Sequence, residues 1–232
     1  MRILRKTLIN LILGASALSA QAMFFGQNVT VSGGGSSINT TPAHHAITST
    51  PINVLSITIT AGNLVIVWIG SDSNAGGTAT GCSDAQGNTY TLVGRGISTV
   101  TNYTAEMWYV KNALGGTGNL TCTMTSANGF MGAADYAGAS LTAPLDGSGV
   151  TTSNLSTAGP VTTALSNELL AVVGIAGGSG FTACTGYTII DFKNNTASQG
   201  FETKASTTTG SYQATGCTFA NFFTAYVMAA FK

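Results

Sequence analysis

This chain contains few charged residues. Lys and Arg together number 8, Asp and Glu together number 8, and charged residues make up 7% of the 232 positions. Proteins that bind nucleic acid or an anionic membrane surface need clusters of lysine and arginine to neutralise phosphates. Neither partner is therefore expected.

The sequence also lacks the motifs of several kinds of chemistry. No G-x-S-x-G pentapeptide marks the nucleophile turn of a serine hydrolase. The four cysteines stand far apart, at positions 82, 122, 184 and 217, without a C-x-x-C pair, so a zinc site is not expected. His44 and His45 are adjacent in a polar segment and are interpreted as solvated loop histidines. No cofactor, metal or catalytic residue set is predicted.

Beyond the first 22 residues no sustained helical periodicity is visible, apart from one turn near Ser166 to Leu170, and strand patterns take its place. In "INVLSITIT", Leu55, Ile57 and Ile59 alternate with polar residues, which indicates a half-buried strand. The continuous apolar run "LVIVWIG" at 64–70 predicts a central strand that is covered on both faces. Further strands are predicted at 88–93, 105–111, 119–126, 131–136, 161–165, 168–175, 187–192 and 222–231.

Short strands separated by turn signals predict an all-β fold, an antiparallel β-sandwich that is jelly-roll-like with about ten strands. No exact internal repeat is visible in the sequence, which disfavours propellers and solenoids. The predicted sandwich domain spans residues 52–232.

The first 22 residues have the pattern of a secretory signal peptide. Arg2, Arg5 and Lys6 precede an apolar run from Leu8 to Leu18, and "AQA" at 20–22 supplies the small residues of a cleavage site. The run is shorter than the roughly 20 residues that a membrane span needs. Cleavage before Met23 is predicted, with an uncleaved or lipid-linked form as the alternative.

The predicted location is secreted or cell-surface, without membrane insertion after cleavage. Residues 23–51 are rich in Gly, Ser and Thr and are interpreted as a flexible leader or arm, with at most one short strand near 28–32. Without residues 1–22, five basic residues stand against eight acids, a formal charge of −3.

Four cysteines in an exported chain predict disulfides. Cys122 shares a strand face with Leu120 and Met124, so its side chain is predicted to point inward. Cys82 ends the incoming strand of a hairpin at 80–93. We therefore predict the pairs Cys82–Cys122 and Cys184–Cys217 among the three pairings that four cysteines allow.

Acids and aromatic residues supply the candidates for a carbohydrate site. Cleavage of a glycosidic bond needs two carboxyl groups about 5–10 Å apart, and the candidates are Glu106 with Asp135 or Asp191. Glu106 is more simply interpreted as an outward-facing strand residue. Carbohydrate binding uses aromatic faces with a few polar groups. The predicted ligand-binding residues are Tyr103, Trp108, Tyr187 and Tyr212.

Five segments in order carry a family resemblance: "AGNLVIVWIGSD", "CSDAQGNTYTLVG", "MWYVKNALGGTGNLTCTM", "ADYAGASLTAPLD" and "SNELLAVVGIAGGSGFT". Over residues 52–232 the chain resembles a widespread group of uncharacterised bacterial and phage-associated secreted β-sandwich proteins. That group has AGNLLVV, D-x-x-GN-x-Y, YxKN and NELL motifs. The resemblance implies a jelly-roll-like sandwich at cell or virion surfaces and no catalytic residues. The cysteines are not part of its pattern.

Three hypotheses of function follow. The first is a secreted, non-catalytic binding or adhesion module whose partner is a surface polysaccharide or glycan. The second is a structural subunit of an extracellular fibre, appendage or virion, which would self-associate. The third, a polysaccharide-cleaving enzyme, is disfavoured because the sequence contains no recognisable catalytic set.

Overall fold

The computed structural model describes residues 37–49, 54–72, 77–126, 128–152, 156–178, 180–194, 197–219 and 224–232. The chain divides into two units, Met1–Gly34 and Gly35–Lys232, and the description concerns the second. The predicted signal peptide at 1–22 and the short strand expected near 28–32 lie outside the described residues.

The described residues form seventeen strands and no helix, and every strand pair is antiparallel. The prediction of an all-β antiparallel sandwich is thus confirmed. The strand number exceeds the expected ten because several strands are short or polar. Two of them, β12 and β16, contain two residues each.

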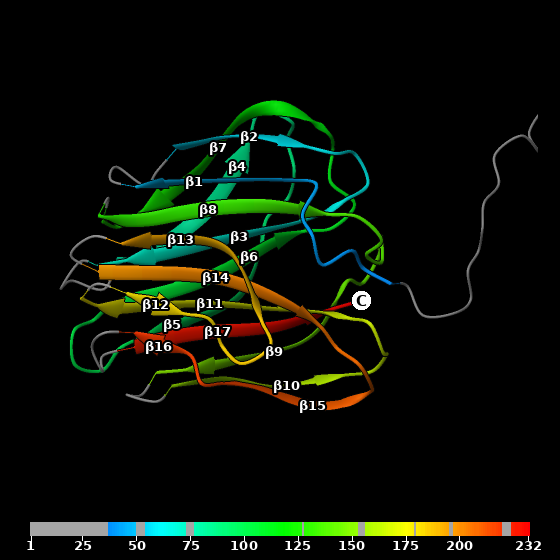
Figure 1. Cartoon of the computed structure of the whole chain (residues 1–232). Helices are drawn as coiled ribbons and strands as arrows, with labels where there is room; N and C mark the ends of the chain where they lie inside the picture. Colours follow the sequence, from blue (N-terminus) through cyan, green and yellow to red (C-terminus); the bar gives the residue numbers. More distant parts are fainter. Residues whose placement is uncertain are drawn as a thin grey trace, which may run out of the picture. The chain divides into compact units, whose positions relative to one another are not determined.

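Two five-stranded sheets form the centre of the fold (Figure 1). The first large sheet has the order β1-β8-β3-β6-β5. Its strands are β1 (His44–Ser49), β3 (Leu64–Ser71), β5 (Thr91–Ile97), β6 (Thr104–Val110) and β8 (Gly129–Tyr136). The second large sheet has the order β13-β14-β11-β17-β9. Its strands are β9 (Leu145–Thr151), β11 (Leu169–Gly177), β13 (Thr188–Asn194), β14 (Ala197–Ala205) and β17 (Thr224–Phe231).

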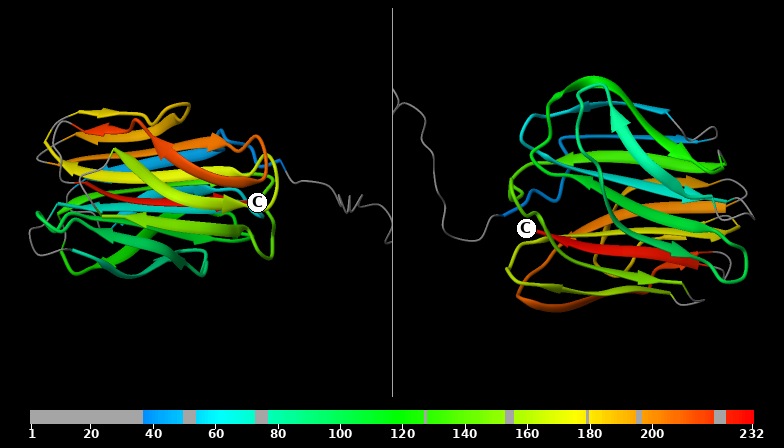
Figure 2. Two further views of the ribbon diagram at one scale, coloured as in Figure 1. Left: turned by 90° about the horizontal axis from the view of Figure 1, so that it is seen from below. Right: turned by 180° about the vertical axis from the view of Figure 1, so that it is seen from behind.

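Smaller sheets cover the outer face of each large sheet. The order β2-β7-β4 covers the first large sheet, and the pairs β10-β15 and β12-β16 cover the second. These strands are β2 (Val54–Ile59), β4 (Ala79–Asp84), β7 (Gly116–Met124), β10 (Thr157–Thr163), β12 (Phe181–Thr182), β15 (Gly210–Thr215) and β16 (Thr218–Phe219). In the view from below in Figure 2, β4 to β7 (teal to green) and β14 to β15 (orange) lie on opposite sides of the stack.

The chain builds the same topology twice. The first large sheet has the order β1-β8-β3-β6-β5, and the second, taken from its other edge, has the order β9-β17-β11-β14-β13. If β15 and β16 are counted as one strand interrupted at Gly216 and Cys217, both orders are first, eighth, third, sixth and fifth within their half of the chain. We call β1–β8 the first repeat and β9–β17 the second repeat. The duplication is visible in the strand order, whereas the sequence contains no exact internal repeat.

The turn before each central strand has the same construction in both repeats. Gly62 has a φ of 84°, and Asn167, at the equivalent position, has a φ of 61°. The two turns are held by matching pairs of backbone hydrogen bonds. Ala113 bonds to Gly62 and Asn63, and Ser206 bonds to Asn167 and Glu168, at 2.8–2.9 Å in all four cases.

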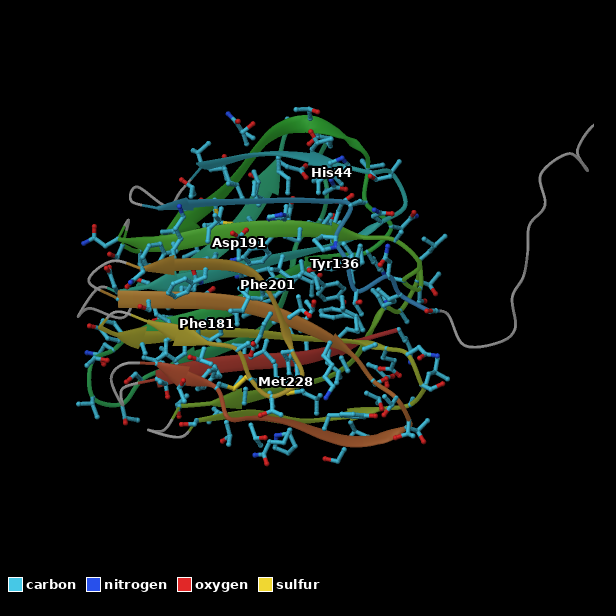
Figure 3. The ribbon with its side chains drawn as sticks, viewed as in Figure 1. His44, Tyr136, Phe181, Asp191, Phe201 and Met228 are labelled. Carbon is cyan, nitrogen blue, oxygen red and sulfur yellow. A yellow bond between two sulfur atoms is a disulfide. The ribbon has the colours of Figure 1, made fainter. Side chains whose placement is uncertain are left out.

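Three hydrophobic cores separate the four layers. The central core lies between the large sheets, and it contains Trp68 stacked on Phe201 with ring centroids 4.0 Å apart. Figure 3 marks Phe201 and Tyr136, two of its large side chains. Each repeat also has an outer core beneath its small sheets. β3 is buried on both faces because its residues alternate between the central core and the outer core of the first repeat.

Strand β1 extends the sandwich into the segment that the sequence assigns to the leader. His44–Ser49 pairs with β8 along the edge of the first large sheet, so that the described sandwich begins before residue 52. The carboxylate of Asp135 on β8 accepts bonds from the backbone N–H of His44 at 2.7 Å and contacts its Nδ1 at 3.1 Å. A contact with a distant residue, which the local sequence does not reveal, therefore holds this polar strand in place.

Candidate functional site

A polar groove of about 280 Å³ lies in the first repeat, between the β4–β5 turn and the end of β6. It is lined by Gly87, Asn88, Thr89, Thr91, Val110, Lys111, Asn112 and Leu114. We call it groove 1. Its two walls come from the segments "DAQGNTY" and "YVKN", two of the motifs on which the family resemblance depends.

The carboxylate of Asp84 fixes the turn that forms groove 1. It accepts bonds from the backbone N–H groups of Gln86 and Asn88, from the Asn88 amide at 2.7 Å and from the Tyr90 hydroxyl at 2.8 Å. Burial alone would raise the pKa of Asp84, but these hydrogen bonds, led by those from Asn88, lower it below its usual value. Gly87 adopts a φ of 79°, which favours glycine at this position of the turn.

Asn88 also ties the turn to the opposite wall of groove 1. Its Oδ1 accepts the backbone N–H of Leu114 at 2.7 Å, and its Nδ2 donates to the Leu114 carbonyl at 3.1 Å. The exposed Lys111 donates from Nζ to the Thr142 carbonyl at 2.9 Å. Because an ammonium group has three donors, two remain for a ligand.

A second groove, of about 230 Å³, lies in the second repeat. It is lined by Thr40, Thr41, Gly186, Thr188, Ile190, Thr203, Lys204 and Ala205. We call it groove 2. Gly186 has a φ of 78° in the turn where the Tyr187 N–H donates to the Cys184 carbonyl at 3.0 Å. Thr203 Oγ1 donates to the Thr40 carbonyl at 3.3 Å and so joins two of the segments that line groove 2.

The two grooves occupy equivalent places in the two repeats. Each has a turn glycine before the fifth strand, Gly87 or Gly186, and a lysine near the end of the sixth strand, Lys111 just after β6 or Lys204 within β14. The two lysines are not at matching register positions, because Lys204 pairs with Leu170 as Val110 pairs with Val65. Threonines occur in both linings. No Asp or Glu is among the described residues that line either groove. Two similar polar grooves therefore arise from one duplicated topology.

Both grooves open near the same end of the strands. Tyr109, next to groove 1, packs against Phe231 at the end of β17, with ring centroids 5.8 Å apart. Leu169 pairs with Phe231 on one side and with Ala205 of groove 2 on the other. In Figure 1 this is the end at which the C-terminus lies.

The four aromatic residues predicted to bind ligand are distributed over all three cores. Tyr103 packs against the central core, and Trp108 lies in the outer core of the first repeat with 7% of its surface exposed. Tyr187 and Tyr212 pack against the outer core of the second repeat. Only Tyr187 is beside a groove, since it stands between Gly186 and Thr188 of groove 2. Its ring lies 5.6 Å from the Nζ of Lys204.

Two of the three acids considered for glycosidic cleavage, Glu106 and Asp135, are held within the fold. Glu106 is fully buried, and its oxygens accept bonds from the Ala79 N–H, the Arg95 guanidinium and the Trp108 indole at 2.9–3.2 Å. This position corrects its interpretation as an outward-facing residue. Asp135 is also fully buried, and its second oxygen accepts bonds from the N–H of Thr60 and the amide of Asn63.

The two histidines also make specific contacts. In addition to the bond between His44 and Asp135, His45 Nδ1 lies 3.0 Å from Asp191 Oδ2 and so joins β1 of the first repeat to β13 of the second. The interpretation as loop histidines is therefore corrected, because both stand at the start of a strand.

The predicted disulfide pairing is confirmed. Cys82 bonds to Cys122 across β4 and β7, and Cys184 bonds to Cys217 at the equivalent place in the second repeat. Two disulfides indicate folding in an oxidising compartment. Cys184, Cys217 and Glu202 are the one group of three metal-ligand types close together among the described residues. Both cysteines are oxidised, so neither thiolate is free to bind a metal.

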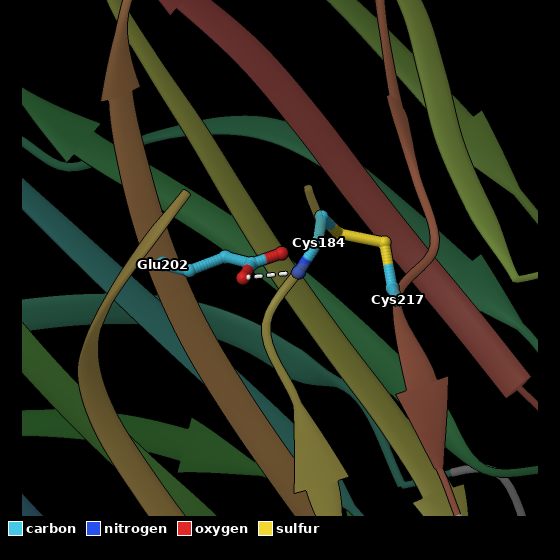
Figure 4. Close-up of side chains that lie close together, drawn as sticks. All are labelled: Cys184, Glu202 and Cys217. Carbon is cyan, nitrogen blue, oxygen red and sulfur yellow. Dashed lines mark hydrogen bonds between the residues drawn. A yellow bond between two sulfur atoms is a disulfide. The ribbon is translucent and has the colours of Figure 1, made fainter. Parts of the chain in front are cut away.

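Glu202 is a buried carboxyl group beside this second disulfide (Figure 4). Its Oε2 accepts the backbone N–H of Cys184 at 2.9 Å, and its Oε1 has no hydrogen-bond partner among the described residues. Burial raises the pKa of Glu202 to about 7 despite this bond. By contrast, Glu106, a buried acid on β6 of the first repeat, is neutralised by Arg95.

Comparison with known proteins gives no match to a family model, a curated protein or a solved structure. Among the described residues there is no helix of the length and apolar character needed to cross a membrane.

Proposed function

We propose that this chain is an exported, non-catalytic binding or adhesion module that recognises surface polysaccharide through grooves 1 and 2. The observation that carries the proposal is the pair of equivalent polar grooves at one end of the sandwich. Threonine hydroxyls, an asparagine amide and a lysine ammonium are groups that hydrogen-bond sugar hydroxyls. The disulfides and the N-terminal signal pattern support export.

The grooves are smaller than most drug-sized pockets, which occupy about 300–1,000 Å³. A groove of about 230 or 280 Å³ is adequate for one or two sugar units of a chain that continues into solvent. Apolar patches are also present in both grooves, at Val110 and Leu114 or at Ile190 and Ala205. These patches can contact the less polar face of a sugar ring.

The test is a binding screen of the purified, disulfide-intact protein against neutral and acidic polysaccharides and cell-wall polymers. We expect at least one polymer to bind, and we expect Thr91→Val in groove 1 and Thr188→Val in groove 2 to weaken binding. Thr58→Val is the matched control, because Thr58 is an exposed strand threonine on β2, outside both grooves. Absence of binding across the panel, or equal binding by all three variants, would remove the proposal.

A second candidate function is that of a structural subunit that self-associates. The edge strand β5 exposes Leu92 and Ile97, and the neighbouring edge strand β9 exposes Val150. Edge strands with exposed apolar residues are templates for pairing with another chain. Sedimentation at high protein concentration tests this function. We expect an oligomer that Ile97→Lys converts to a monomer, and a monomeric wild type would eliminate the candidate.

A further inference from the structure

Each groove presents one lysine and no carboxylate among its described lining residues. This is unusual in a chain with so little charge. Five basic residues remain after the predicted cleavage, and two of them, Lys111 and Lys204, are in the grooves. The chain therefore places one lysine in each of the two polar grooves, although at different register positions of the two repeats.

Neither ammonium group is neutralised by a salt bridge among the described residues. Lys111 donates one hydrogen bond to a neutral carbonyl, that of Thr142. Lys204 lies over the ring of Tyr187, an interaction that leaves its positive charge in place. Both lysines can therefore attract an anionic group on a ligand that also offers hydroxyls to the threonines.

The geometry also relates the two grooves to each other. β1 faces β13, through His45 and Asp191, and β5 faces β9, through Ser148 and Val93. Equivalent strands of the two repeats therefore follow one another in opposite order across the two large sheets. The sixth strands of the repeats, β6 and β14, nevertheless end at the same end of the sandwich. An approximate twofold axis along the strands accounts for both observations and places the grooves on one end face.

We infer that grooves 1 and 2 form a bivalent site for an acidic polysaccharide, in which each lysine binds a carboxylate of the same polymer. This inference rests on the proposed function and specifies its ligand class and its valency. When the first groove is occupied, the second binding event becomes intramolecular, which raises affinity for long chains without any new contact. Short oligosaccharides, which cannot span the grooves, bind each one separately.

The experiment uses the disulfide-intact protein with polygalacturonate, alginate and hyaluronate, each compared with its carboxyl-reduced neutral form. Binding is measured by titration calorimetry. We expect the acidic forms to bind and the neutral forms to bind at least about tenfold more weakly. Lys111→Gln and Lys204→Gln should each weaken binding of the long acidic polymer by about 100-fold, the low end of the gain from linked sites. Lys193→Gln, which removes a lysine outside both grooves, is the matched control and should bind as wild type does.

A trisaccharide of the best acidic polymer then tests the valency. We expect two trisaccharides per wild-type chain and one per chain in either single lysine variant. A wild-type stoichiometry of one overturns the bivalent site. Equal binding of acidic and neutral forms, or full binding by the lysine variants, overturns the acidic ligand class while leaving polysaccharide binding intact. Absence of binding to every neutral and acidic polymer overturns the proposed function as well.

Discussion

Glu202 Oε2 accepts a hydrogen bond from the backbone N–H of Cys184 at 2.9 Å, while Glu202 Oε1 lies buried with no hydrogen-bond partner in the part of the chain that the structure describes. A carboxylate in such a position has lost water and has gained one hydrogen bond in exchange. The folded protein therefore favours the protonated form of this group. Glu106 offers a contrast, because the guanidinium of Arg95 and the indole of Trp108 satisfy its carboxylate in the first repeat.

The stability of the fold is expected to fall between about pH 4.5 and pH 7 because of Glu202. Its pKa is about 7 when folded and 4.5 by reference, so the folded state holds a proton that the unfolded state has released over this interval. The effect is absent below the lower value and constant above the upper one. At about 1.4 kcal/mol per pKa unit, Glu202 lowers the free energy of unfolding by about 3 kcal/mol at pH 8 relative to pH 4. Urea unfolding at several pH values measures this change.

The variant Glu202→Gln removes the titrating group and should remove this part of the pH dependence. Glu106→Gln is the control at another buried acid, on β6 of the first repeat. It leaves Arg95 without its charged partner and should lower stability by about 3–5 kcal/mol at all of these pH values. An unchanged difference in stability between pH 4 and pH 8 in Glu202→Gln would contradict the assignment.

The two disulfides should contribute similarly to stability, since they occupy equivalent places in the two repeats. They span 40 and 33 positions of sequence. In the chain-entropy description, loops of these lengths are each worth about 4 kcal/mol. We expect the double variant Cys82→Ala/Cys122→Ala and the double variant Cys184→Ala/Cys217→Ala to lose comparable amounts in urea unfolding. A large loss from one pair and none from the other would show that the repeats are not equivalent in stability.

Local periodicity was sufficient to predict the strands whose burial follows from their own residues. Leu55, Ile57 and Ile59 are buried on β2 while their neighbours are exposed, as alternation predicts. The continuous apolar run of β3 is buried throughout. Strands such as β1 and β9, with sequences HHAITS and LDGSGVT, have no apolar pattern. They are strands because a partner strand supplies their hydrogen bonds, and the local sequence contains no record of that partner.

The candidate site was less predictable for a related reason. The sequence indicates aromatic residues as surfaces for sugar binding. Trp108, however, stands on a strand that is covered on both faces, so its ring is buried in a core and cannot contact a ligand. The groove residues are Gly, Thr, Asn and Lys, which also occur in ordinary turns. The motifs "DAQGNTY" and "YVKN" did contain the signal for groove 1. Their convergence depends on the pairing of β5 with β6, which is a tertiary property.

Gly132 on β8 is required by the close approach of the Trp68 ring. A Cβ atom at this position would overlap the indole, and Trp68 is held from the other side by Phe201. We expect Gly132→Ala to lower the free energy of unfolding by about 3 kcal/mol, the upper range for overpacking of a rigid core. Gly81→Ala is the control, because a Cβ on β4 at Gly81 has no neighbour within 4 Å. Equal stability of the two variants in urea would show that the contact between the repeats is looser than the stack of Trp68 on Phe201 indicates.

Tyr212 should ionise at a lower pH than the buried Tyr187 and Tyr226. The side-chain bonds to Thr207 and Thr208, followed by bonds from their backbone N–H groups at 3.0 and 2.9 Å, lower its pKa to about 8 against a small opposing effect of burial. Burial instead raises the pKa of Tyr187 and of Tyr226. Titration followed at the phenolate absorbance should therefore show one tyrosine ionising near pH 8, a step that is absent in Tyr212→Phe. Because the folded state releases this proton first, Tyr212 should add stability as pH rises from about 8 to 10. Thr208→Val removes one of the hydroxyl partners of Tyr212 and should move its ionisation to higher pH. A wild type that shows no phenolate absorbance below pH 9 would contradict the hydrogen-bond assignment at Tyr212.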